Sequence, residues 1–286
     1  MVNTYMSFKK KLLSANFHKQ AGEVLFNTDI STYIKHIIIS IVLGLIAGGG
    51  AILFHHMLEK MRHLFIPANL TRQFNVGSYF IIIIPLIGAC ICVLMTRIFI
   101  HVAKEKGVLS VIKSIIINKG YIPFKVTLFH LFASLISIGT GMPLGPEGPA
   151  AKIGSGFGSL MSQGFKLKRE DMMMYTAAGA GAAIAAVFNA PIAGVFFGIE
   201  VILLNDLKNK ALSALIISAV VANMLSHSFL GNQHIFNIPR YSLGGISEYP
   251  FYLLFGFISG LIALFYFELK AFFGYIIEKI PIKHKY

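Results

Sequence analysis

Glu147 is the one ionisable side chain in a stretch rich in glycine and proline, Gly-Thr-Gly-Met-Pro-Leu-Gly-Pro-Glu-Gly-Pro at residues 139–149. Pro149 suits the first turn of a helix, where its missing N–H costs nothing, so Glu147 is expected at a helix N-terminus. Such an end carries partial positive charge and unsatisfied N–H donors, and it therefore attracts anions. We expect Gly145 and Gly148 to expose backbone N–H groups there, and Glu147 to occupy the anion site when ionised and leave it when protonated.

The alternative is that Glu147 only caps its own helix. An ionisable residue between apolar segments favours a functional role, because burying charge in a membrane is costly.

A second break lies within residues 172–199, a run without charged residues that is interrupted by Asn189 and Pro191. Asn189 is expected to cap a new helix that has Pro191 in its first turn. The alanines and glycines before it are typical of closely packed membrane helices. Glu200, near the end of this segment, is either a proton carrier or a residue at the membrane boundary, and the boundary is the favoured interpretation.

The composition identifies the environment of these breaks. Of 286 residues 56% are hydrophobic and only 13% are charged, and the mean hydropathy is +0.72. Too few polar side chains exist to cover a surface in water, which excludes a soluble enzyme, a disordered chain and a fibrous protein. The formal net charge of +13 is explained by the positive-inside rule rather than by nucleic acid, which we do not expect as a partner.

The apolar runs predict an all-α, polytopic membrane protein with broken half-helices. Unbroken spans are expected at residues 37–54, 78–96 and 249–267. The lysine-rich stretch at residues 101–125 is expected on the same side as the N-terminus, which makes that side cytoplasmic. No Ser/His pair, paired carboxylates or metal-spaced histidines are evident, and His55, His56 and His63 are placed in a polar loop. We therefore expect no enzyme activity, cofactor or metal.

Two motifs resemble one family. Gly145-Pro146-Glu147-Gly148-Pro149 with Ile153-Gly154 is similar to the Gly-Lys/Arg-Glu-Gly-Pro signature of the ClC chloride channels and chloride/proton antiporters. Residues 188–194, Phe-Asn-Ala-Pro-Ile-Ala-Gly, with Glu200 at the expected distance, resemble that family's next segment. The resemblance implies a homodimer in the cell membrane, surrounded by lipid, in which each subunit has its own path for chloride or a similar anion. The family's gating glutamate falls on Glu147.

The chain departs from the family pattern at three places. Pro146 replaces the basic residue of the signature, so a positive charge near the anion path is missing. The family's first anion-binding loop, Gly-Ser-Gly-Ile-Pro, aligns best with residues 105–109, which makes Lys106 and Gly107 anion-binding candidates, although a plain cytoplasmic lysine is favoured for Lys106. Val201 stands where proton-coupled members have a glutamate, so the protein is expected to be uncoupled unless Glu200 substitutes, from a direction rotated by roughly 100°.

The resemblance divides the chain into three parts. Residues 1–32 form a basic cytoplasmic segment, residues 33–240 a first inverted repeat, and residues 241–286 a linker and the opening helix of a second repeat that is otherwise absent. The expected function is glutamate-gated transport of chloride or a similar small monovalent anion, uncoupled from protons. The alternative is a truncated or degenerate structural or regulatory membrane subunit that does not conduct on its own.

Overall fold

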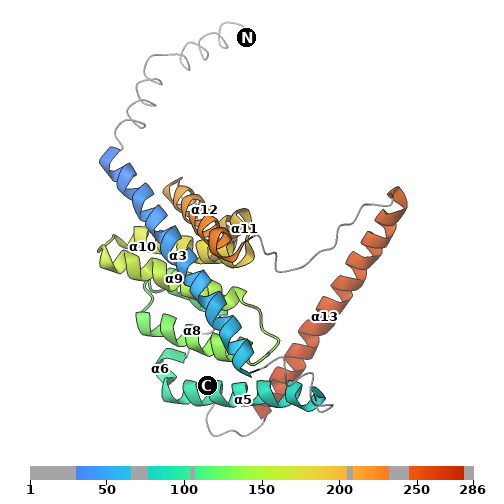
Figure 1. The fold of residues 1–286 in the computed structure, drawn as a ribbon. Helices are drawn as coiled ribbons and strands as arrows, with labels where there is room; N and C mark the ends of the chain where they lie inside the picture. The colour runs from blue at the N-terminus through green and yellow to red at the C-terminus, as the bar shows by residue number, and fades with distance from the viewer. Residues whose placement is uncertain (1–29, 66–76, 104–106, 205–208, 232–244, 280–286) are drawn as a thin grey trace. The chain divides into compact units, whose positions relative to one another are not determined.

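The computed structural model describes residues 30–65, 77–103, 107–204, 209–231 and 245–279, and all regular structure within them is helical (Figure 1). The helices are α3 Ile30–Phe65, α5 Gly77–Ile98, α6 Ile100–Ala103, α7 Gly107–Ile116, α8 Phe124–Gly139, α9 Glu147–Gly164, α10 Arg169–Phe188, α11 Pro191–Phe196, the π-helix η1 Phe197–Ile202, α12 Asn209–Leu230, the 3-10 helix η2 Ile246–Glu248 and α13 Tyr249–Lys279. The predicted basic segment at residues 1–32 lies almost wholly outside the described residues.

Several of these helices are long enough to cross a bilayer. Four in the described part of the chain are long and apolar enough to cross a membrane: Thr32–Phe65, Arg169–Phe188, Ala211–Leu230 and Ile246–Ile276. Shorter apolar helices lie at Ile82–Ile98, Gly107–Ile116, Phe124–Gly139 and Pro191–Ile202. This mixture of full-length and short apolar helices confirms the predicted fold class, an all-α polytopic membrane protein with broken helices.

The first helix is longer than the sequence predicted. α3 continues from the apolar run to Phe65, so His55, His56 and His63 lie on a helix and their placement in a loop was wrong. The polar residues there are compatible with a helix, and Glu59 lies one turn from His55, with 3.5 Å between its carboxylate and the imidazole Nε2. The polar residues after Phe54 end the apolar run, but the helix continues through them.

The interior of the bundle is built from small residues. α10 packs against α9, α12 and α3. In Figure 1, α9 and α10 are the yellow-green helices at the middle of the bundle. A Cβ atom on Gly154 would lie 2.2 Å from the carbonyl oxygen of Gly179, and one on Gly158 would lie 2.2 Å from that of Tyr175. Because neither glycine has a Cβ, the backbones of α9 and α10 approach each other directly.

The break between α10 and α11 is confirmed, but Asn189 has a different role from the predicted one. Asn189 adopts the left-handed conformation, with φ 50° and ψ 42°, at the C-terminus of α10. The residue before α11 is Ala190, and Pro191 is in the first turn of that helix. Asn189 therefore ends one helix rather than capping the next, because asparagine tolerates left-handed backbone better than other side chains do.

The chain separates into two compact units, residues 1–235 and 236–286. In the second unit, α13 contains the predicted span at residues 249–267 and extends beyond it to Lys279. Its described side chains are exposed nearly throughout, and most of them are large and apolar. A helix that is apolar on all sides needs an apolar environment, lipid or protein, on all sides.

Candidate functional site

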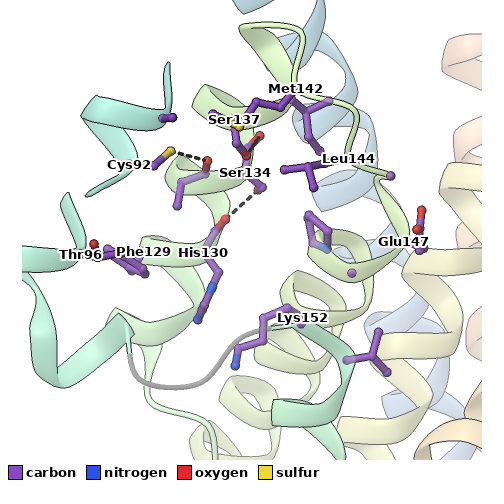
Figure 2. A pocket seen from close by; sticks show the side chains of 18 of the residues that line it. Cys92, Thr96, Phe129, His130, Ser134, Ser137, Met142, Leu144, Glu147 and Lys152 are labelled. Carbon is purple, nitrogen blue, oxygen red and sulfur yellow. Dashed lines mark hydrogen bonds between the residues drawn. The ribbon is translucent and has the colours of Figure 1, made fainter. Parts of the chain in front are cut away.

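A cavity of about 730 Å³ lies within the first unit. Residues of α5, α7 and α8, the linker after α8 and the first turns of α9 line it, and Figure 2 shows the side chains that enclose it. The lining is mainly apolar, but four of its side chains can ionise or carry charge: Cys92, His130, Glu147 and Lys152. The site is therefore an apolar chamber with a small number of ionisable groups.

Glu147 lies at the first residue of α9, on the wall of this cavity. Its carboxylate folds back over Gly145: a Cβ atom on that glycine would lie 2.1 Å from Oε2 and 2.3 Å from Oε1. The residue before the helix is Pro146, whose side chain forms no capping hydrogen bond. Glu147 is exposed, and no other described residue forms a hydrogen bond or ion pair with its carboxylate. It is positioned by packing against a glycine, which leaves the carboxylate able to move.

The glycines named from the sequence lie around the same cavity. Gly145 and Gly148 line it on either side of Glu147, and a Cβ atom on Gly148 would meet nothing within 4 Å. Gly107 lines it from the start of α7, with a left-handed backbone at φ +66°. Lys106 lies outside the described residues. The structure thus brings together three of the four predicted anion-binding residues with the predicted gate.

Glu200 lies elsewhere. It belongs to η1, is exposed, and is not part of the cavity wall. Its neighbour Val201 is partly buried and packs against the apolar cluster around Val111 and Ala151. Because η1 is a π-helix, in which hydrogen bonds join residues five apart, the rotation expected from an α-helix does not apply to this pair. The site and Glu200 are separate features of the fold.

Lys152 was missed by the sequence interpretation. It is only 2% exposed, yet it contributes to the cavity wall from α9. Its ammonium donates a hydrogen bond to the Ser110 hydroxyl of α7, and that hydroxyl donates to the carbonyl oxygen of Gly107 at 2.7 Å. The sequence did carry a signal, because Lys152 is the lone charged residue between Glu147 and Lys166, in a glycine-rich stretch.

Two further polar residues of the cavity were also absent from the sequence prediction. His130 lines it from α8, where its ring contacts Phe129 with 5.4 Å between the ring centroids. Cys92 lines it from α5, and its thiol donates to the Ala133 carbonyl oxygen of α8 at 3.6 Å. Among the described residues no three His, Cys, Asp or Glu side chains are grouped as metal ligands would be.

The sequence profile described as "Voltage gated chloride channel" matches residues 87–285. That match spans well over half of the chain and includes the whole of the cavity wall. The chain belongs to the voltage-gated chloride channel family. The motifs at Glu147 and Asn189 therefore reflect true membership of that family.

Two curated relatives show how much of such a protein this chain represents. The chloride channel protein CLC-e of Arabidopsis thaliana is 29% identical over 242 residues, which cover 78% of this chain and 33% of that protein. The H+/Cl− exchange transporter ClcA of Vibrio cholerae is 32% identical over 150 residues, covering 50% of this chain and 31% of the relative. The matched parts of the chain thus cover about a third of the length of each of these family members.

A solved structure shows the same fold. The X-ray structure of a slow cyanobacterial Cl−/H+ antiporter aligns with a TM-score of 0.65 over 79% of this chain and 54% of that chain. The two sequences are 22% identical in this alignment, so the similarity concerns the arrangement of helices.

Proposed function

We propose that this chain forms the glutamate-gated part of a path for chloride or a similar small monovalent anion, with Glu147 as the gate. The observation that carries the proposal is the position of Glu147 at the start of α9, on the wall of a cavity that Gly145, Gly148 and Gly107 also line. Helix N-termini and exposed N–H groups attract negative charge. The membership in the voltage-gated chloride channel family agrees with this chemistry.

The gating step is a competition between two negative groups. When ionised, the Glu147 carboxylate takes the place of the anion; when protonated or displaced, it leaves the place free. The carboxylate rests against Gly145 without a hydrogen bond or ion pair to any other described residue, so few contacts need to break for it to move.

The proposal also covers the domains, the location and the assembly of the protein. Residues 33–240 correspond to a first inverted repeat, residues 241–286 to a linker and the opening helix of a second one. We propose that the protein lies in the cell membrane with its N-terminus in the cytoplasm, as a homodimer with one path in each subunit. We also propose that transport is uncoupled from protons. Two observations support this: Val201 is apolar and packs against the cluster around Val111 and Ala151, and Glu200 is exposed and does not line the cavity.

Chloride efflux from vesicles tests this function. The protein is reconstituted into vesicles loaded with potassium chloride, and efflux is started with valinomycin at a series of external pH values. We expect efflux from the parent to rise in external acid, and Glu147→Gln to give efflux that no longer responds to pH. Glu59→Gln is the matched control, because Glu59 is an exposed carboxylate on α3 outside the cavity wall.

Three results of the vesicle assay would contradict parts of this proposal. Potassium release without movement of a counter-anion would contradict anion transport. A parent protein and a Glu147→Gln variant that both fold and both retain all chloride would instead support the non-conducting subunit. A pH response that survives in Glu147→Gln would remove Glu147 as the gate.

A further inference from the structure

A basic surface lies at one end of the first unit, where two turns between helices meet. The acids of these segments are Glu170 and Asp171, in the first turn of α10. No described residue forms an ion pair with any of the exposed cations that make up the surface. These cations, called the basic surface below, are Lys119, Lys125, Lys166, Lys168 and Arg169.

Short contacts hold the two turns side by side. The Thr176 hydroxyl donates to the Gly120 carbonyl oxygen at 2.9 Å, and a Cβ atom on Gly120 would lie 2.7 Å from the backbone nitrogen of Met173. The Ile122 amide donates to the Ser159 hydroxyl at 2.8 Å. The turn after α7 therefore lies against α9 and the first two turns of α10, which places all five cations at the same end of the unit.

Two of these cations have a backbone conformation that lysine rarely adopts. Lys119 has φ 52° in the turn after α7, and Lys166 has φ 50° just after the C-terminus of α9. Left-handed backbone favours glycine or asparagine and is unfavourable for other side chains. Glycine at either position would relieve the backbone and remove the charge, so glycine variants separate the two effects.

Exposed aromatic side chains lie among the cations. They are Tyr121 and Phe124 around the start of α8 and Phe165 at the end of α9. The turns also adjoin apolar helices, since α10 begins at Arg169 and is a candidate membrane span. Aromatic rings and basic side chains at the ends of spanning helices lie at the depth of the lipid headgroups. The basic surface is therefore within reach of lipid phosphates.

We propose that the basic surface binds the headgroups of anionic phospholipids. Ammonium and guanidinium groups donate charge-assisted hydrogen bonds to phosphate oxygens. The start of α3 lies at the same end of the unit, because the Tyr175 hydroxyl and the His36 Nδ1 are 2.5 Å apart. The orientation given under the proposed function puts this end in the cytoplasm, next to the leaflet that carries anionic lipids.

Lipid titration tests the proposal. The full chain in a neutral detergent is titrated with dioleoylphosphatidylglycerol or dioleoylphosphatidylcholine, and native mass spectrometry counts the bound lipids. We expect the parent to prefer phosphatidylglycerol. Lys119→Gly/Lys166→Gly should bind it roughly 25-fold more weakly, because each basic residue near an anionic surface is worth roughly fivefold in affinity. The matched control is Lys60→Gln/Arg62→Gln, which removes two exposed cations near the other end of α3 and should bind as the parent does.

Two further arms identify the source of the phosphate. Glycerol 3-phosphate has the same phosphate chemistry without acyl chains, and it should not displace phosphatidylglycerol at equal concentration. Displacement would mean that the surface binds free phosphate esters, and it would overturn the lipid proposal. Higher ionic strength should weaken the binding of phosphatidylglycerol and leave that of phosphatidylcholine unchanged, because salt screens exposed charges. A preference that salt does not change would contradict an electrostatic surface.

The variants decide whether the basic surface is responsible. A parent that binds both lipids equally would overturn the proposal, as would equal phosphatidylglycerol affinity in the parent and the folded glycine variant. Equal weakening in the control pair on α3 would assign the preference to net charge instead. If the glycine variant does not fold, Lys125→Gln/Arg169→Gln, in the first turns of α8 and α10, replaces it with the same expectation. Lipid affinity is measured without anion transport, so failure here leaves the proposed function intact.

Discussion

Gly145 determines where the Glu147 carboxylate rests. A methyl group there would lie 2.1 Å from Oε2, closer than any real contact, and the carboxylate is the part that can give way. The φ angle of Gly145 lies outside the left-handed region, so alanine acts by its volume alone. We predict that Gly145→Ala displaces the gate, which raises chloride efflux at neutral pH and removes most of its response to external acid in the vesicle assay.

Gly148 provides the matched control for that prediction. It lines the same cavity, but a Cβ atom there meets nothing within 4 Å. Gly148→Ala should therefore keep the pH response of the parent. Equal loss of pH response in both variants would mean that the carboxylate does not depend on the room beside Gly145.

The sequence predicted part of this site because part of it is local. Pro149 and the glycines of the linker are enough to place Glu147 at a helix start, and the structure agrees. Lys152 could not be placed in the same way, since its hydrogen-bond partner Ser110 belongs to α7 and lies 42 residues away in the chain. Helical spacing gives the face of α9 on which a lysine lies, but it does not say which helix covers that face.

The elements of the bundle depend on contacts between glycines. A Cβ atom on Gly154 would lie 2.2 Å from the Gly179 carbonyl oxygen, whereas one on Gly49 of α3 meets nothing within 4 Å. We predict that Gly154→Ala lowers the free energy of unfolding by roughly 1–3 kcal/mol because α9 and α10 must separate. Gly49→Ala should raise it by about 0.5–1 kcal/mol through lower backbone entropy in the unfolded chain. Thermal unfolding in detergent measures both, and equal midpoints would contradict the packing.

Asn189 shows why the position of a break was predictable while its chemistry was not. Asparagine is favoured both before a helix and in the left-handed residue that ends one, so the sequence leaves both roles open. The structure selects the second, with φ 50°. We predict that Asn189→Ala lowers the free energy of unfolding by about 1 kcal/mol more than Asn189→Gly does, because glycine accepts positive φ. Equal losses in the two variants would assign the effect to the side chain instead.

At the scale of the whole molecule, composition was sufficient for the fold class and motifs were sufficient for the family. The helix ends were less predictable: α3 extends to Phe65 and α13 to Lys279, beyond their apolar runs. An apolar run predicts only the part of a helix that lies in the hydrocarbon core. Backbone hydrogen bonds allow the same helix to continue through polar residues on either side. The curated relatives contain more chain than the match reaches, because the aligned parts cover 33% and 31% of their lengths.

Proton coupling is a property of the whole path, and the arrangement around η1 supports its absence. A coupled path needs a second side chain that takes up protons, and the side chain of Val201 cannot do so. Glu200 is exposed and does not contribute to the cavity wall. We predict that the reconstituted protein dissipates a chloride gradient without moving protons uphill, as a pH-sensitive dye inside the vesicles would show. Glu200→Gln should leave both readings unchanged. Proton movement driven by chloride in the parent and lost in Glu200→Gln would assign the relay to Glu200, and it would require the π-helix to reorient that side chain toward the path during transport.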